Sequence, residues 1–150
     1  MALRVAATPE RAFAVFTDEI GEWWQPNGMF RLTPGGPGVM TFEPGPGGRL
    51  VERYPGGDEY EVGRITRWDP PVELAFHWRP ASFSAEQTTE VHVRFEPVGA
   101  DTRVVVEHIG WDTIAPEHAA RHGFPLAIFL QREAEWWQAL LRSLQSKVQA

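Results

Sequence analysis

The 150-residue sequence contains no cysteine. Disulfide bonds, thiolate nucleophiles and cysteine-ligated zinc sites are therefore excluded. No apolar run approaches the ~20 residues that a membrane-spanning helix needs. The N-terminus also lacks the apolar core of a signal peptide. We therefore expect a cytoplasmic protein without a membrane span.

Positive charge is also scarce. The sequence has 14 lysines and arginines against 20 aspartates and glutamates, which gives a formal net charge of −6. Nucleic-acid-binding domains usually present a basic stripe. The arginines within residues 49–53 and 64–67 are interrupted by acidic and apolar residues. The sequence therefore predicts no nucleic-acid partner.

Motifs for phosphate, dinucleotide and metal binding are absent as well. Gly35, Gly36 and Gly38 precede no helix, so we interpret them as turn residues. His118 and His122 are four residues apart and would share one face of a helix, as metal ligands do. The residues between them lack the glutamate of H-E-x-x-H, and no third ligand is evident. The sequence therefore predicts neither a metal nor a cofactor.

Aromatic residues, in contrast, are abundant, with seven tryptophans and nine phenylalanines. Near the C-terminus, apolar residues recur at alternating steps of four and three, which predicts one face of an α-helix. This stripe consists of Leu130, Ala134, Trp137, Leu141, Leu144 and Val148. Trp136 and Leu140 lie beside the stripe and widen it. A helix this aromatic must be buried against a concave surface or must line a cavity.

The rest of the sequence predicts a strand, two short helices and six further strands. Thr8, Pro9 and Glu10 form a helix start, with an N-cap, a proline at the first position and an acid in the first turn. They follow an alternating strand over residues 2–7. The helix is expected over about residues 9–18, and a second helical turn over residues 20–24. Glycine and proline then separate short apolar runs at 39–43, 49–54, 60–68, 72–78, 88–96 and 102–109, which is typical of an antiparallel meander.

These elements predict a single α+β domain over residues 1–150. We expect a helix-grip arrangement, in which a curved antiparallel sheet wraps around a long C-terminal helix. Two short helices follow the first strand. The length is sufficient for one domain with a substantial core.

Several short motifs in the sequence occur in the order found in a known family. They are Ala7–Phe13 (ATPERAF), Trp23-Trp24, Gly63–Pro71 (GRITRWDPP), Leu74–Trp78 (LAFHW), Thr102–Trp111 (TRVVVEHIGW) and the terminal series Trp137, Leu141 and Leu144. In this order the chain resembles the START-like (SRPBCC) superfamily, in the branch similar to the heat-shock-protein-90 ATPase activator. The position before Trp137 is a glycine in the family and is Trp136 here. The resemblance thus implies that Trp137 anchors the helix and that Trp136 alters the cavity.

The superfamily includes lipid carriers, hormone receptors, cyclases and co-chaperones, so the fold alone does not decide the function. We predict that the protein binds a small hydrophobic or amphipathic molecule in a cavity between the sheet and the C-terminal helix. Cavities lined by aromatic residues with a few polar groups are typical of such sites. The candidate ligand-binding residues are Trp24, Phe42, Phe76, Trp78, Phe95, His108 and Trp136.

An enzyme is the first alternative. His108 shares a strand face with Val104 and Val106, so it should point inward. A buried imidazole either contacts a ligand and acts as a base, or is a structural histidine bonded to a backbone group or a tryptophan. Glu52 shares its strand phase with Leu50 and is the other candidate. The two would form a proton-transfer pair in a cyclase, dehydratase or hydrolase, as in the cyclase relatives. The sequence commits to no catalytic residue and favours a binding protein.

A module that regulates a chaperone ATPase is the second alternative. The eukaryotic co-chaperone that the sequence resembles carries an additional domain, which these 150 residues do not contain. We therefore expect no chaperone partner. Either a monomer or a homodimer fits the sequence.

Overall fold

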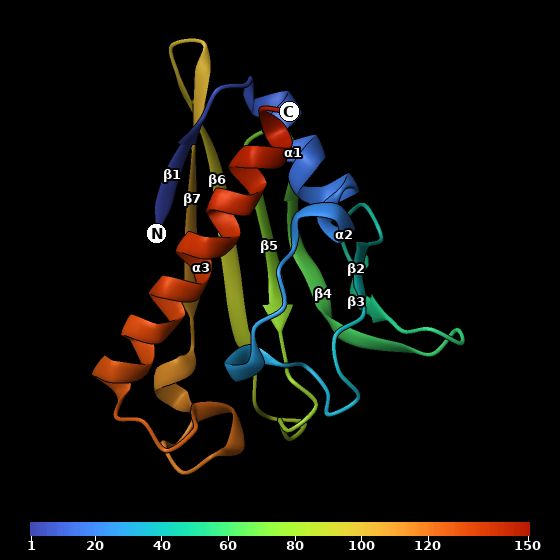
Figure 1. Ribbon diagram of the computed structural model, residues 1–150, viewed down its shortest axis with the longest axis vertical. Helices are drawn as coiled ribbons and strands as arrows, with labels where there is room; N and C mark the ends of the chain where they lie inside the picture. The colour runs from blue at the N-terminus through green and yellow to red at the C-terminus, as the bar shows by residue number, and fades with distance from the viewer.

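The computed structural model describes residues 1–150 and contains one seven-stranded antiparallel sheet (Figure 1). The strand order is β1-β7-β6-β5-β4-β3-β2. The strands are β1 (Ala2–Val5), β2 (Val39–Phe42), β3 (Arg49–Arg53), β4 (Glu59–Asp69), β5 (Glu73–Trp78), β6 (Thr89–Val98) and β7 (Asp101–Ile109). All seven strands lie where the sequence predicts them, and every strand end is within two residues of its predicted position.

Helices cover one face of this sheet (Figure 1). α1 (Pro9–Asp18) begins where the Thr8 side chain accepts a hydrogen bond from the Arg11 backbone N–H, at 3.3 Å. α2 (Ile20–Trp23) follows directly, and α3 (Leu126–Val148) crosses the sheet as the long C-terminal helix. Both α1 and α2 contact α3. The predicted α+β helix-grip fold is confirmed.

The buried face of α3 differs from the predicted stripe in its first half. Leu130 is 41% exposed, and Ala134 is only half-buried. Phe129 and Glu133 occupy the buried row instead, and they continue into Trp137, Leu141, Leu144 and Val148. The prediction passed over Glu133 because acidic residues are rarely buried without a partner. Burial raises the pKa of the Glu133 carboxyl to about 8, so the side chain is mostly a neutral acid at pH 7.

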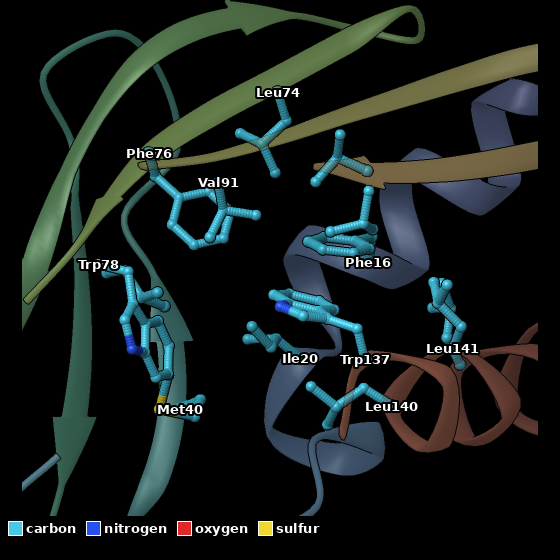
Figure 2. Close-up of a cluster of buried hydrophobic side chains, with 14 of the residues drawn as sticks. Phe16, Ile20, Met40, Leu74, Phe76, Trp78, Val91, Trp137, Leu140 and Leu141 are labelled. Carbon is cyan, nitrogen blue, oxygen red and sulfur yellow. The ribbon is translucent and has the colours of Figure 1, made fainter. Parts of the chain in front are cut away.

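The centre of the core is an aromatic cluster between α1, α3 and the sheet. Figure 2 shows Trp137 of α3 extending into this cluster with Phe16 of α1 and Phe76 of β5. All three side chains are fully buried. Side chains therefore fill the space between the middle of α3 and the sheet.

Neither α3 nor any shorter helix combines the length and the apolar character that crossing a lipid bilayer requires.

Candidate functional site

A cavity of about 280 Å³ lies beneath the segment that joins α2 to β2. Within this segment, residues 24–38, the chain forms only one short 3₁₀ helix, η1 (Gly28–Phe30). The rest of the wall comes from Gly21 on α2, Met40 on β2, Glu52 on β3, Trp78 on β5 and Trp136 on α3. The cavity thus lies mainly between a loop and the sheet, with a single residue from α3.

Four aromatic side chains form the apolar wall, namely Trp24, Phe30, Trp78 and Trp136. The Trp136 ring is stacked on Phe30, with 4.2 Å between the ring centroids and 5° between the planes. The Trp136 and Trp78 ring centroids are 5.5 Å apart. Trp136 is only 4% exposed and lines the cavity, so its ring closes one side of it.

Glu52 places a carboxylate in this wall although the residue is only 7% exposed. The Tyr54 hydroxyl donates to Glu52 Oε1. Thr33 Oγ1 lies 2.8 Å from the same phenol oxygen and donates to it, since the phenol proton is already used. Burial and the bond to Glu52 raise the pKa of Tyr54 to about 12, so it remains a donor at neutral pH. Glu52 Oε2 accepts no hydrogen bond from the protein and is left to the cavity.

The loop approaches Glu52 closely because residue 38 is a glycine. A Cβ atom at Gly38 would collide with the carbonyl oxygen of Arg53 and would lie 2.9 Å from Glu52 Cγ. Such contacts are shorter than real Cβ atoms make. Gly38 therefore lets the segment pack on β3 and close the cavity over the carboxylate.

His108 lies in the sealed core and lines neither this cavity nor the second pocket described below. The indole N–H of Trp137 donates to His108 Nδ1 at 3.1 Å. His108 Nε2 must then carry the ring proton, and it lies 2.9 Å from Thr89 Oγ1. The Thr89 hydroxyl donates onward to the carbonyl of Trp78, at 2.6 Å.

Burial lowers the pKa of His108 to about 3, so the ring is neutral at pH 7. Both ring nitrogens are hydrogen-bonded, and no hydrogen bond joins His108 to Glu52. His108 and Glu52, the two candidate catalytic residues, therefore form hydrogen bonds with different partners and not with each other.

The predicted ligand-binding residues divide into two groups. Trp24, Trp78 and Trp136 line the cavity. Phe42, Phe76 and Phe95 are buried among other core rings, as in the Phe42–Phe76 pair with centroids 5.2 Å apart, and like His108 they line neither pocket. All of them point inward, but alternation along a strand does not show which part of the interior is filled.

Sequence reasoning did not identify Phe30, Arg31, Thr33 and Met40, which also line the cavity. Three of them belong to the segment over residues 24–38, in which the sequence predicts only turn residues, at Gly35, Gly36 and Gly38. The available signal was the length of this segment, because long irregular loops in compact domains are often binding elements.

His118 and His122 do not share a helix face. The chain forms only a 3₁₀ turn here, η3 (Ala119–Arg121), and the two histidines cap its opposite ends. His118 Nε2 lies 3.1 Å from the Ser82 carbonyl oxygen, and His122 Nε2 lies 2.6 Å from that of Met29. Each histidine thus ties this turn to another loop.

A second pocket, of about 500 Å³, is lined by residues 28–34 and by parts of three other loops. It shares Phe30, Arg31 and Trp78 with the first cavity and adds Trp111 and His122. No acidic side chain lines it. The carboxylate of Glu52 therefore distinguishes the first cavity from the second pocket.

Comparison with known families gives one match over nearly the whole sequence. The model described as activator of Hsp90 ATPase homolog 1-like protein matches residues 6–149. The chain belongs to this family. The membership confirms the resemblance that the six short sequence motifs indicated.

Solved structures agree with this assignment. The anthrahydroquino-gamma-pyrone synthase Txn09 is 31% identical, with a TM-score of 0.55 over 85% of this chain and 87% of that chain. An HSP90 activator from Plasmodium falciparum, PFC0360w, is 18% identical, with a TM-score of 0.64 over 99% and 93%. The Aha1 dimer from Colwellia psychrerythraea is 19% identical, with a TM-score of 0.61 over 99% and 93%.

The last two likenesses show the fold alone. A search of curated proteins gave no match. The family and the Txn09 structure broadly support ligand binding or a cyclase-type function.

Proposed function

We propose that this protein binds a small aromatic or amphipathic molecule in the cavity beneath residues 24–38. The observation that carries this proposal is an aromatic wall with a single buried carboxylate, of which one oxygen has no protein partner. Small-molecule sites are typically apolar concavities with a few such polar groups. Burial of the ligand contributes about 25 cal/mol per Å² of apolar surface before the costs of association.

In this proposal Trp24, Trp78 and Trp136 contact the ligand, and Phe30 holds the Trp136 ring in place. Glu52 orients the polar end of the molecule. His108 and the buried phenylalanines support the wall from behind, without contact to the ligand.

The indole N–H signals of the seven tryptophans provide the test. Titration with naphthalene derivatives, followed by ¹H–¹⁵N NMR, should shift the signals of Trp24, Trp78 and Trp136. The signal of Trp68, which packs on Phe13 away from the cavity, should stay in place.

Two variants on adjacent residues of β2 make the test specific. Met40→Trp should fill the cavity and abolish the shifts, because Met40 lines it. Val39→Trp is the matched control, since Val39 is 57% exposed and lines neither pocket. Equal binding by wild type and Met40→Trp would contradict the proposal.

A cyclase-type reaction is the second candidate function, and two observations favour it. The 31% identical relative is described as a synthase that forms a γ-pyrone. Glu52 Oε2 faces the cavity without a partner and can accept a proton as a general base. His108 has no part in this scheme, because both of its nitrogens are already bonded.

A simple model substrate is an o-hydroxyaryl 1,3-diketone. Its phenol oxygen attacks the distal ketone, Glu52 takes the phenol proton, and loss of water leaves a γ-pyrone. We expect the protein to accelerate this ring closure, as followed by absorbance, and Glu52→Gln to remove most of the acceleration. Glu61→Gln is the matched control, because Glu61 is an exposed partner of Arg64 on the neighbouring strand. Undiminished activity of Glu52→Gln would refute the role of Glu52.

A further inference from the structure

Glu52 differs from the other strand carboxylates in having no cationic partner. Glu59, Glu73 and Glu107, for example, form ion pairs with arginines. Glu52 is only 7% exposed and receives one hydrogen bond, from Tyr54. A carboxylate has about four acceptor positions, and the protein supplies a donor to only one of them. The free oxygen therefore favours a ligand group that brings N–H or O–H donors and positive charge.

The wall around this oxygen suits a cation. Trp24, Trp78 and Trp136 line the same cavity as Glu52, and the Trp24 centroid is 5.5 Å from that of Trp78 and 5.9 Å from that of Trp136. Indole is the best aromatic partner for an ammonium group, because its ring carries a strong negative potential on its faces. Three indoles and a carboxylate around one space thus favour the same ligand charge.

One positive side chain also lines the cavity. Arg31 is exposed, forms no ion pair and contributes to both pockets, so it lies at the rim. It would attract an anionic group from water, where charges are strongly screened. Glu52 is buried, where the same charge acts at lower dielectric. The net charge of −6 also favours the approach of cations over long range.

We propose that the cavity selects an aromatic amine in its cationic form. The ammonium donates a hydrogen bond to Glu52 Oε2 and lies against the indole rings, while the aromatic part of the ligand fills the apolar wall. This assignment rests on the proposed function, namely that the cavity binds small aromatic molecules. It adds the charge of the ligand that the cavity prefers.

Three probes with one ring and different head groups test the assignment. They are benzylammonium, benzyl alcohol and phenylacetate, titrated at pH 7 against the indole N–H signals. Wild type should bind benzylammonium roughly tenfold more tightly than benzyl alcohol, as expected of a charge-assisted hydrogen bond with a cation–π contact. Phenylacetate should bind most weakly.

Glu52→Gln should weaken binding of benzylammonium far more than binding of benzyl alcohol, and it should thereby remove the preference between the two. Glu61→Gln should keep the wild-type order. Arg31→Gln provides a second test that does not depend on Glu52. This variant should bind benzylammonium more tightly, because it removes a like charge.

The outcomes separate the two proposals. If benzyl alcohol binds as tightly as benzylammonium, or if phenylacetate binds best, the amine assignment is overturned and the binding function stands. If Glu52→Gln weakens all three probes equally, charge selection by Glu52 is also overturned. If none of the probes shifts the signals of Trp24, Trp78 and Trp136 while naphthalene derivatives do, the amine assignment fails alone. If neither these probes nor the naphthalene derivatives shift the three signals, both proposals are overturned.

Discussion

The two adjacent tryptophans of α3 lie in regions of opposite character. Trp137 lies in the sealed core, where its N–H is bonded to His108 and the chain of hydrogen bonds continues through Thr89 to a backbone carbonyl. Trp136 lies in the wall of the cavity, which also contains Glu52 with one oxygen unbonded. Both regions combine indole rings with one buried titratable group. They differ in whether the protein supplies hydrogen-bond partners to every polar atom of that group. This difference distinguishes a packed core from a candidate binding site.

Truncation of the two tryptophans gives the largest expected contrast. Trp137→Ala should lower the free energy of unfolding by about 3–5 kcal/mol, since it empties the core and removes the donor to His108. Trp136→Ala should cost less, because the space it leaves joins the cavity and admits water. Urea denaturation of both variants measures the difference. Equal losses would mean that both rings belong to one core.

Acid should destabilise the core through His108. The folded pKa is about 3, against 6.5 for the ordinary side chain, so the unfolded state binds a proton first as pH falls. The contribution to stability is full above pH 6.5 and is lost towards pH 3, at up to about 1.4 kcal/mol per pH unit. The measurement is the free energy of unfolding between pH 7 and pH 4.

His108→Gln is the control for this pH dependence. It should be less stable than wild type at pH 7, and its stability should fall less steeply on acidification. Parallel pH profiles would show that His108 is not the group responsible.

Glu133 should act in the opposite direction. Its folded pKa is about 8, against 4.5 ordinarily, so its contribution to stability is full below pH 4.5 and is lost as pH rises through 8. Glu133→Gln keeps the shape of the neutral acid and removes the titration. We expect its melting temperature to exceed that of wild type by an amount that grows from pH 5 to pH 8. A constant difference across this range would contradict a buried, titrating Glu133.

Removing one hydroxyl from each region gives the smallest contrast. Thr89→Val deprives His108 of its partner inside the core and should cost about 1–3 kcal/mol. Tyr54→Phe removes the donor to Glu52, but the carboxylate can turn to water in the cavity, so the loss of stability should be smaller. Thermal unfolding compares the two variants. A larger loss for Tyr54→Phe would reverse the distinction between sealed core and open cavity.

Local chemistry in the sequence was sufficient to predict the elements of the fold. Thr8 and Pro9 mark the start of α1, and glycine and proline separate the strands, because these residues act through their own backbone geometry and nearest neighbours. The helical period also identified Trp137 and Leu141 as buried, although it failed at Leu130. A burial row that includes Glu133 cannot be recognised from hydrophobicity.

The candidate site was only partly predictable. Inward-pointing residues follow from strand alternation, and both Glu52 and His108 are indeed buried. Alternation could not show that Trp137 satisfies His108 or that Glu52 keeps a free oxygen. Those facts depend on partners that are distant in the sequence, as in the contact between His108 of β7 and Trp137 of α3.

The tryptophan pair shows where the division lies. Periodicity is a property of one segment, so the sequence alone could predict that a C-terminal helix buries Trp136 and Trp137. The different surroundings of the two rings became visible only in the folded protein, where Trp137 closes a hydrogen-bonded core while Trp136, stacked on Phe30, borders the cavity that Glu52 lines. The reason is physical: filled and empty space, like satisfied and unsatisfied polar atoms, result from the packing of several elements together and are encoded in none of them alone.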